Sequence, residues 1–140
     1  MNILIQKPPI WEEAHKHFEI DDARTIYTYG DTIYNPSNVI IDPDVLEHES
    51  VHVRQQANTE GGPRAWWRHY FDDMSFRIGQ EAEAYGRQYW SFCRHEKDRN
   101  KQTRYLYMIA GFLGSKMYGV EIKNSEALAL IKAMANMVKE

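Results

Sequence analysis

The sequence predicts an α+β fold that is mainly helical, with a small N-terminal β-hairpin or sheet placed just before a metal-binding helix. Strand-forming residues lie on both sides of the turn signal Gly30-Asp31, whereas apolar residues recur at helical spacing through most of the chain that follows. Between these regions, residues 48–52 read His-Glu-Ser-Val-His, the pattern HExxH. At 140 residues, 43% of them hydrophobic, the chain is long enough to build one core. We therefore expect a single domain over residues 1–140.

The first part of the chain predicts short elements that lead up to this helix. An apolar run before Pro8-Pro9 is typical of a strand or an extended arm. Two runs rich in Thr, Ile and Tyr are separated only by Gly30-Asp31, a spacing that is typical of a hairpin. The expected elements are a strand or arm at residues 3–5, a helix at 10–18 and hairpin strands at 25–29 and 32–34.

The HExxH segment lies in a stretch that favours one continuous helix. Asp42 and Pro43 are residue types that start helices, as the N-cap and the first helical residue. No Pro or Gly falls between Val45 and Ala57, so nothing interrupts the helix there. The adjacent glycines and the proline at 61–63 should end it sharply.

The rest of the chain predicts helices joined by polar connections. The charged run at residues 95–101 is expected to be one such connection and to be solvated. The last helix is expected to be capped by Asn124 or Ser125. The predicted helices span residues 64–73 and 76–95, as one broken helix or two, then 104–118 and 125–138.

The spacing of HExxH suits a catalytic zinc ion. On a helix, His48 and His52 lie one turn apart on the same face, so both imidazoles can reach one ion. A catalytic zinc ion takes three protein ligands and leaves a fourth position for water. Glu49 can then remove a proton from that water as the general base. The alternative interpretation is a surface helix on which the two histidines are solvated.

The sequence offers two candidates for the third ligand, Glu81 and Glu83, in the helical run about thirty residues after the motif. Residues two apart point to different faces of a helix, so only one of them can face the metal. We favour Glu81, because apolar residues surround it, whereas Glu83 can form a surface ion pair with Arg87 one turn later. The reverse assignment, with Glu83 as the ligand, stays open.

HExxH followed by a helix that carries Glu81-Ala82-Glu83-Ala84-Tyr85 resembles the gluzincins, the thermolysin-like zinc peptidases. More closely, the chain resembles minimal, single-domain gluzincin-like proteins that phages or prophages often encode, over roughly residues 25–120. The run His52-Val53 with Gln55-Gln56 at the helix end belongs to this resemblance. Larger relatives carry an Asp four residues after the ligand Glu, where this chain has Tyr85, so the partner of a motif histidine is unassigned. The resemblance implies a zincin-like fold and a Zn²⁺ ion held by His48, His52 and Glu81.

The resemblance also implies the reaction, hydrolysis of a peptide or protein substrate by a zinc-bound water that Glu49 activates. The spacing of the motif alone indicates only metal-assisted hydrolysis. Tyr70, Tyr85 and Tyr118 are candidates to stabilise the developing oxyanion, although each is more often structural. The remaining histidines are weaker candidates or solvated residues: His69 and His95 in the first group, His15 and His17 in the second.

A second hypothesis is a phage-type structural or virion-associated protein with this fold and little or no peptidase activity. The small size and the missing Asp after Glu81 support it, and it would assemble in a virion or as a homo-oligomer. A purely structural zinc site is a weaker hypothesis. Such sites usually have four ligands rich in Cys, and Cys93 is the single cysteine.

The composition argues against several other classes of protein. A formal net charge of −3 gives no reason to expect a nucleic-acid partner. No apolar run approaches the roughly 20 residues of a membrane span, so no membrane partner is expected. The N-terminus becomes polar too quickly for a signal peptide. Together with the single cysteine, this predicts a cytoplasmic protein, or a virion protein if a phage encodes it.

Overall fold

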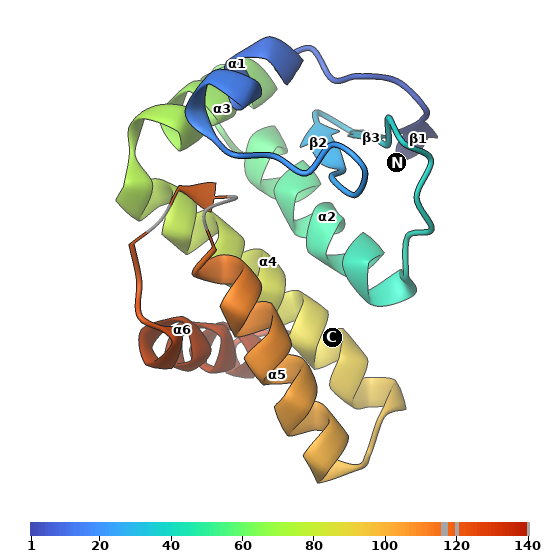
Figure 1. The fold of residues 1–140 in the computed structure, drawn as a ribbon, viewed down its shortest axis with the longest axis vertical. Helices are drawn as coiled ribbons and strands as arrows, with labels where there is room; N and C mark the ends of the chain where they lie inside the picture. The colour runs from blue at the N-terminus through green and yellow to red at the C-terminus, as the bar shows by residue number, and fades with distance from the viewer. Residues whose placement is uncertain (116–117, 120, 140) are drawn as a thin grey trace.

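The structure, a computed structural model, describes residues 1–115, 118–119 and 121–139. This part of the chain forms six helices and a three-stranded sheet, which confirms an α+β, mainly helical fold (Figure 1). The sheet, α1 and α3 lie at one end, and α4 leads from there to α5 and α6 at the other. The elements are β1 (Asn2–Leu4), α1 (Trp11–His17), β2 (Tyr27–Tyr29), β3 (Thr32–Tyr34), α2 (Pro43–Ala57), α3 (Gly62–Asp72), α4 (Met74–His95), α5 (Arg99–Leu113) and α6 (Asn124–Asn136).

The three strands form one sheet in the order β1-β3-β2. Strands β2 and β3 are antiparallel, with Tyr29 opposite Thr32, so the predicted hairpin is confirmed. The turn between them contains Gly30 at a φ of 65°, a conformation that glycine adopts without strain. The N-terminal residues form a strand rather than a free arm, because β1 pairs in parallel with β3. As a result, β2 lies at one edge of the sheet, beside α2.

Helix α2 spans the predicted stretch and is fixed to α4 at its start. Asp42 occupies the N-cap position, but its side chain makes no capping hydrogen bond. Asp44 in the first turn instead accepts hydrogen bonds from Ser91 Oγ at 2.7 Å and His95 Nε2 at 2.9 Å, both near the end of α4. Helices α2 and α4 therefore run antiparallel, and the HExxH face of α2 lies against α4.

Helix boundaries after α2 differ from the prediction where polar side chains cap the helices. Asp73 separates α3 from α4, because its carboxylate accepts the Phe76 amide at 3.0 Å. Asp98 caps α5 in the same way, through the amides of Asn100 and Lys101. The predicted connection is confirmed but is shorter than 95–101: residues 96–98 join the two helices, while His95 ends α4 and residues 99–101 begin α5, and most of this run is exposed.

The ends of the last two helices also differ from expectation. Helix α5 ends at Leu113, so Tyr118 lies in the segment that follows it and not on the helix. The N-cap of α6 is Lys123, without a side-chain hydrogen bond, so the predicted caps at Asn124 and Ser125 are wrong.

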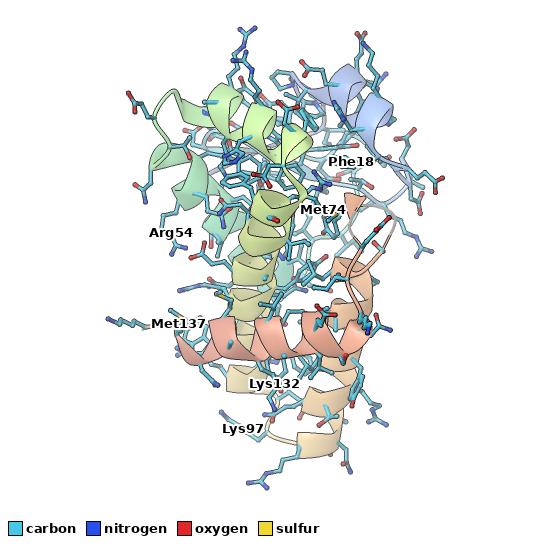
Figure 2. The ribbon with its side chains drawn as sticks, turned by 90° about the vertical axis from the view of Figure 1, so that its left-hand side faces the viewer. Phe18, Arg54, Met74, Lys97, Lys132 and Met137 are labelled. Atoms are coloured by element: carbon cyan, nitrogen blue, oxygen red, sulfur yellow. The ribbon has the colours of Figure 1, made fainter. Side chains whose placement is uncertain are left out.

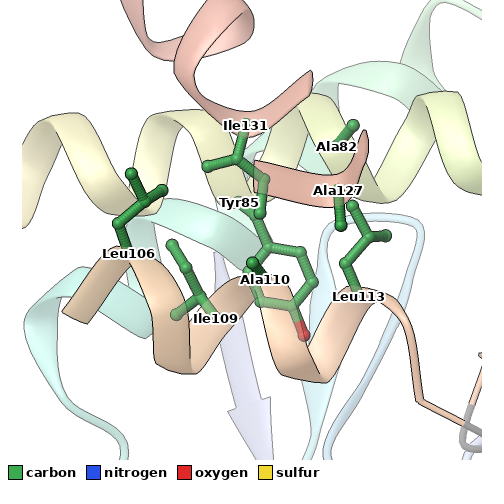
Figure 3. Packing of buried hydrophobic residues seen from close by; sticks show 8 residues of the cluster. All are labelled: Ala82, Tyr85, Leu106, Ile109, Ala110, Leu113, Ala127 and Ile131. Carbon is green, nitrogen blue, oxygen red and sulfur yellow. The ribbon is translucent and has the colours of Figure 1, made fainter. Parts of the chain in front are cut away.

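Helix α4 is shared by the two hydrophobic clusters of the fold. One cluster lies among α4, α5 and α6, where Tyr85 packs between residues of the other two helices (Figure 3). The other lies around α1, β2 and α3, and it contains Trp66 and Trp67. Between the clusters, the face of α4 that meets α2 carries buried polar residues, and the candidate site lies there.

The crossing of α4 and α6 depends on a glycine. Figure 2 shows α6 lying across α4, and a Cβ at Gly86 would be only 2.5 Å from Met134 Cβ. We expect Gly86→Ala to lower the free energy of unfolding by about 1–3 kcal/mol, because the helices must move apart. Gly79→Ala on the same helix is the matched control, since a Cβ there meets nothing within 4 Å. It should stabilise the protein by about 0.5–1 kcal/mol. Urea unfolding measures both, and equal losses would contradict the close crossing.

Candidate metal centre

Helices α2 and α4 bring His48, His52 and Glu81 together at one point. The Nε2 atoms of the two histidines are 3.2 Å apart, and they lie 3.2 and 3.1 Å from Glu81 Oε1. All three side chains are buried. The structure therefore brings together the three predicted ligands, and the alternative of two solvated histidines is wrong.

The spacing of these three atoms fits a metal ion. Bonds of about 2.0–2.1 Å that meet at a tetrahedral angle place their ligand atoms about 3.3–3.4 Å apart. The observed separations of 3.1–3.2 Å are close to that value. Two imidazole nitrogens and one carboxylate oxygen also form the three-ligand set that leaves one position open. The group can therefore hold a metal ion.

Gln55 fixes the proton of His52 on the nitrogen that points away from this centre. His52 Nδ1 lies 2.8 Å from Gln55 Oε1. The oxygen and nitrogen of the Gln55 amide cannot exchange places without the loss of two hydrogen bonds. Its Nε2 donates to the Gln80 carbonyl at 3.1 Å and to Glu83 Oε1 at 2.7 Å. Nδ1 of His52 must therefore donate, and the lone pair of Nε2 faces Glu81.

Gln88 holds His48 in the corresponding way. Its Oε1 lies 2.9 Å from His48 Nδ1, and its Nε2 donates to the hydroxyl of Tyr105 at 2.8 Å. When each imidazole is neutral and carries its proton on Nδ1, the lone pairs of both Nε2 atoms and of Glu81 Oε1 therefore point toward one another. Such a buried cluster requires a cation, either a metal ion or a proton.

Tyr70 directs the carboxylate of Glu81. Its hydroxyl donates to Glu81 Oε2 at 2.6 Å, which leaves Oε1 to face the histidines. Burial and the neighbouring Glu81 charge raise the pKa of Tyr70 well above its ordinary value, so the phenol stays a donor. Tyr70 is therefore a partner of the ligand and is not free to act on an oxyanion.

In the absence of a metal ion, a shared proton balances the cluster. Burial lowers the pKa of His52, but the charge and hydrogen bond of Glu81 outweigh burial and raise it to about 9. Burial raises the pKa of Glu81, but the histidines outweigh it and hold that pKa far below the ordinary value. A divalent cation at this point would replace the proton.

Glu49 lies beside the three ligands, held by the edge strand of the sheet. The hydroxyl of Thr28 on β2 donates to Glu49 Oε1 at 2.8 Å, while Glu49 Oε2 is 3.7 Å from His48 Nε2. Gln56 fixes the hairpin to α2, because it donates to the Thr28 carbonyl at 2.9 Å and accepts from the Gly30 amide at 2.7 Å. One carboxylate oxygen of Glu49 is thus anchored, and the other faces the metal centre.

Glu83 lies outside the group formed by His48, His52 and Glu81, and its predicted ion pair is wrong. It pairs with Arg54 of α2 at 2.9 Å rather than with Arg87, which pairs with Glu47 at 2.8 Å. Both contacts cross between α2 and α4, so the packing of the two helices overrides the neighbour one turn away on the same helix.

A pocket of about 450 Å³ opens over the metal centre. His48, Glu49, His52 and Glu81 lie in its wall. Much of the remaining lining is apolar and comes from the segment before β2, from α2 and from the end of α5: Phe18, Ile20, Ile26, Val45 and Phe112.

A pair of tyrosines faces the same pocket. The hydroxyls of Tyr85 and Tyr118 are 2.6 Å apart, and burial raises the pKa of both phenols well above the ordinary value. Only one of the two hydroxyl hydrogens can lie between the oxygens, so the pair retains a second donor. The ring of Tyr85 packs edge-on against His48, with ring centres 4.5 Å apart.

The other histidines lie away from the centre and have partners of their own. His15, expected to be solvated, is half-buried, and its Nε2 lies 2.6 Å from Asp22 Oδ1. His17 is exposed but stacks on Phe71. His69 lies within ion-pair distance of Asp73, and His95 lies within ion-pair distance of Asp44.

Comparisons of the chain with models of protein families, with curated proteins and with solved structures find no match. No described helix is both long enough and apolar enough to cross a membrane. The interpretation of the site therefore depends on its own geometry and chemistry.

The two acidic residues of α4 give a direct test of the ligand set. Glu81→Gln should lower the affinity for zinc by more than about 100-fold, because loss of an outer partner alone costs about 10–100-fold. Glu83→Gln is the matched control and should lower it by less than about tenfold, since Glu83 reaches the site only indirectly, through Gln55. Competition with a chelator of known affinity measures both, and a larger loss for Glu83→Gln would overturn the assignment.

The proton on His52 makes the stability of the metal-free protein depend on pH. The pKa is about 9 in the folded state and 6.5 for an unperturbed histidine. Its contribution is therefore complete below pH 6.5 and is lost as the pH rises through 9. The free energy of unfolding should fall by about 1–3 kcal/mol over this range, measured by urea unfolding in a chelator. His52→Gln should abolish this fall, whereas an equal fall in that variant would exclude His52 as its source.

Proposed function

We propose that this protein is a zinc-dependent hydrolase, most simply a small metallopeptidase. The observation that carries the proposal is the convergence of three buried ligand atoms, 3.1–3.2 Å apart, in the wall of a pocket that also contains Glu49. A pocket that joins candidate ligands to an oriented carboxylate is the arrangement that metal-assisted hydrolysis needs.

Zinc is the ion that the donor set favours. Two imidazoles and one carboxylate suit zinc better than calcium or magnesium, which prefer oxygen ligands alone. Bound by His48, His52 and Glu81, zinc would supply Lewis acidity that polarises a scissile carbonyl and makes a water more acidic.

Glu49 is proposed to move the proton in both steps of the reaction. Its Oε2 faces the metal centre while Thr28 holds Oε1, so the carboxylate is oriented before a substrate arrives. Acting as the general base, it takes a proton from water as the carbonyl is attacked. It then passes this proton to the leaving amine, which completes cleavage of the peptide bond.

The pair of Tyr85 and Tyr118 is proposed to stabilise the charge that develops on the carbonyl oxygen. Its second hydroxyl hydrogen has no acceptor among the described residues, and both tyrosines line the pocket. Arg77 positions the pair, because its guanidinium donates to the carbonyls of Tyr118 and Gly119. A fixed donor of this kind requires no rearrangement during the reaction.

Substitution of Glu49 separates metal binding from hydrolysis. Glu49→Gln should keep zinc binding within about tenfold but lower the hydrolysis of an unfolded protein substrate by more than about 100-fold, because an amide cannot accept the proton. Metal analysis and a protease assay on the same preparations measure the two effects. Equal inactivity of wild type and variant towards many substrates would instead favour the structural, virion-associated alternative.

A further inference from the structure

Helix α5 carries a pair of exposed apolar side chains at the edge of the pocket. Met108 and Phe112 are 47% and 46% exposed, and they lie one turn apart on the same side of the helix. We refer to these two residues as the apolar strip. Phe112 is also part of the pocket lining, so the strip continues the apolar wall of the pocket onto the surface.

The hydrogen bond of the neighbouring Tyr105 shows which part of the molecule this side of α5 faces. At about 100° per residue, Tyr105 lies within about 60° of both Met108 and Phe112 around the helix. Its hydroxyl accepts a hydrogen bond from Gln88 of α4, and Gln88 is part of the pocket lining. This side of α5 therefore lies beside Gln88, a residue of the pocket wall.

We propose that the apolar strip binds the part of an unfolded polypeptide that leaves the pocket. This inference rests on the proposed function and names its substrate class. A pocket of about 450 Å³ holds a ligand of small-molecule size, so a bound polypeptide must extend beyond it. Folded proteins bury most of their large apolar side chains, so an apolar surface beside the pocket favours unfolded chains over folded ones.

The test uses the full chain with Glu49→Gln, so that a bound polypeptide stays intact. The probe is fluorescently labelled lactalbumin, reduced and alkylated so that it cannot refold, and its binding is followed by fluorescence anisotropy. Combined Met108→Ser and Phe112→Ser should weaken binding at least about tenfold, because two large apolar contacts are lost. Met108→Ser alone should weaken it about threefold, without a change in the pocket itself.

Tyr107→Ser is the matched control. Tyr107 is even more exposed, at 62%, but it lies about 100° from Met108 and about 140° from Phe112 around the same helix. Its replacement should change the affinity by less than about twofold. Thermal unfolding of all variants reports whether the fold is kept, as expected for half-exposed positions.

Each other outcome would overturn the inference. These outcomes are equal binding by the double variant and the control, no binding of the probe by the parent protein, and a change in oligomeric state in place of a change in binding. Sedimentation velocity detects the last of these. Failure of the hydrolase proposal is distinguishable, because it would leave binding dependent on the strip while the wild-type protein fails to cleave the probe.

Discussion

The structure depends on one electrostatic constraint, the meeting of three electron-pair acceptors in a buried site. Gln55 and Gln88 hold the protons of the neutral His52 and His48 rings on the outer nitrogens, so that the lone pairs of both inner nitrogens face Glu81. A buried site of this kind is unstable unless a cation occupies its centre. The packing of α2 on α4 is therefore coupled to whatever cation is bound, a proton in the metal-free protein or a metal ion when one is available.

Adjacent glutamines at the end of α2 connect this constraint to the rest of the fold. Gln55 faces α4 and orients His52, whereas Gln56 faces the hairpin and holds the backbone of Thr28 and Gly30. The hydroxyl of Thr28 in turn reaches Glu49. Residues one apart on a helix point in different directions, so a single turn of α2 fixes both the ligand and the candidate base.

The local parts of the site could be predicted from the sequence, and the parts formed between helices could not. The position of His48 and His52 on the same face of α2 follows from helical spacing alone. By contrast, helical spacing predicts that Glu83 pairs with Arg87 one turn away. It pairs with Arg54 instead, because the packing of α2 against α4 brings Arg54 within reach. Gln88 was missed, although it follows Glu81 by seven residues and thus lies on the same face two turns later. Nothing in the sequence marked its amide as a partner of His48.

Gln88 also bears on the choice between an enzyme and a structural protein. The absence of an Asp four residues after Glu81 favoured the structural hypothesis, because it left a motif histidine without a partner. Tyr85, at that position, packs its ring against His48, while Gln88 one turn further on supplies the oxygen that accepts the Nδ1 proton. A neutral amide oxygen orients the ring as a carboxylate would but adds no negative charge. Glu81 and Glu49 alone would then balance a divalent cation, so the missing Asp no longer counts against a working metal centre.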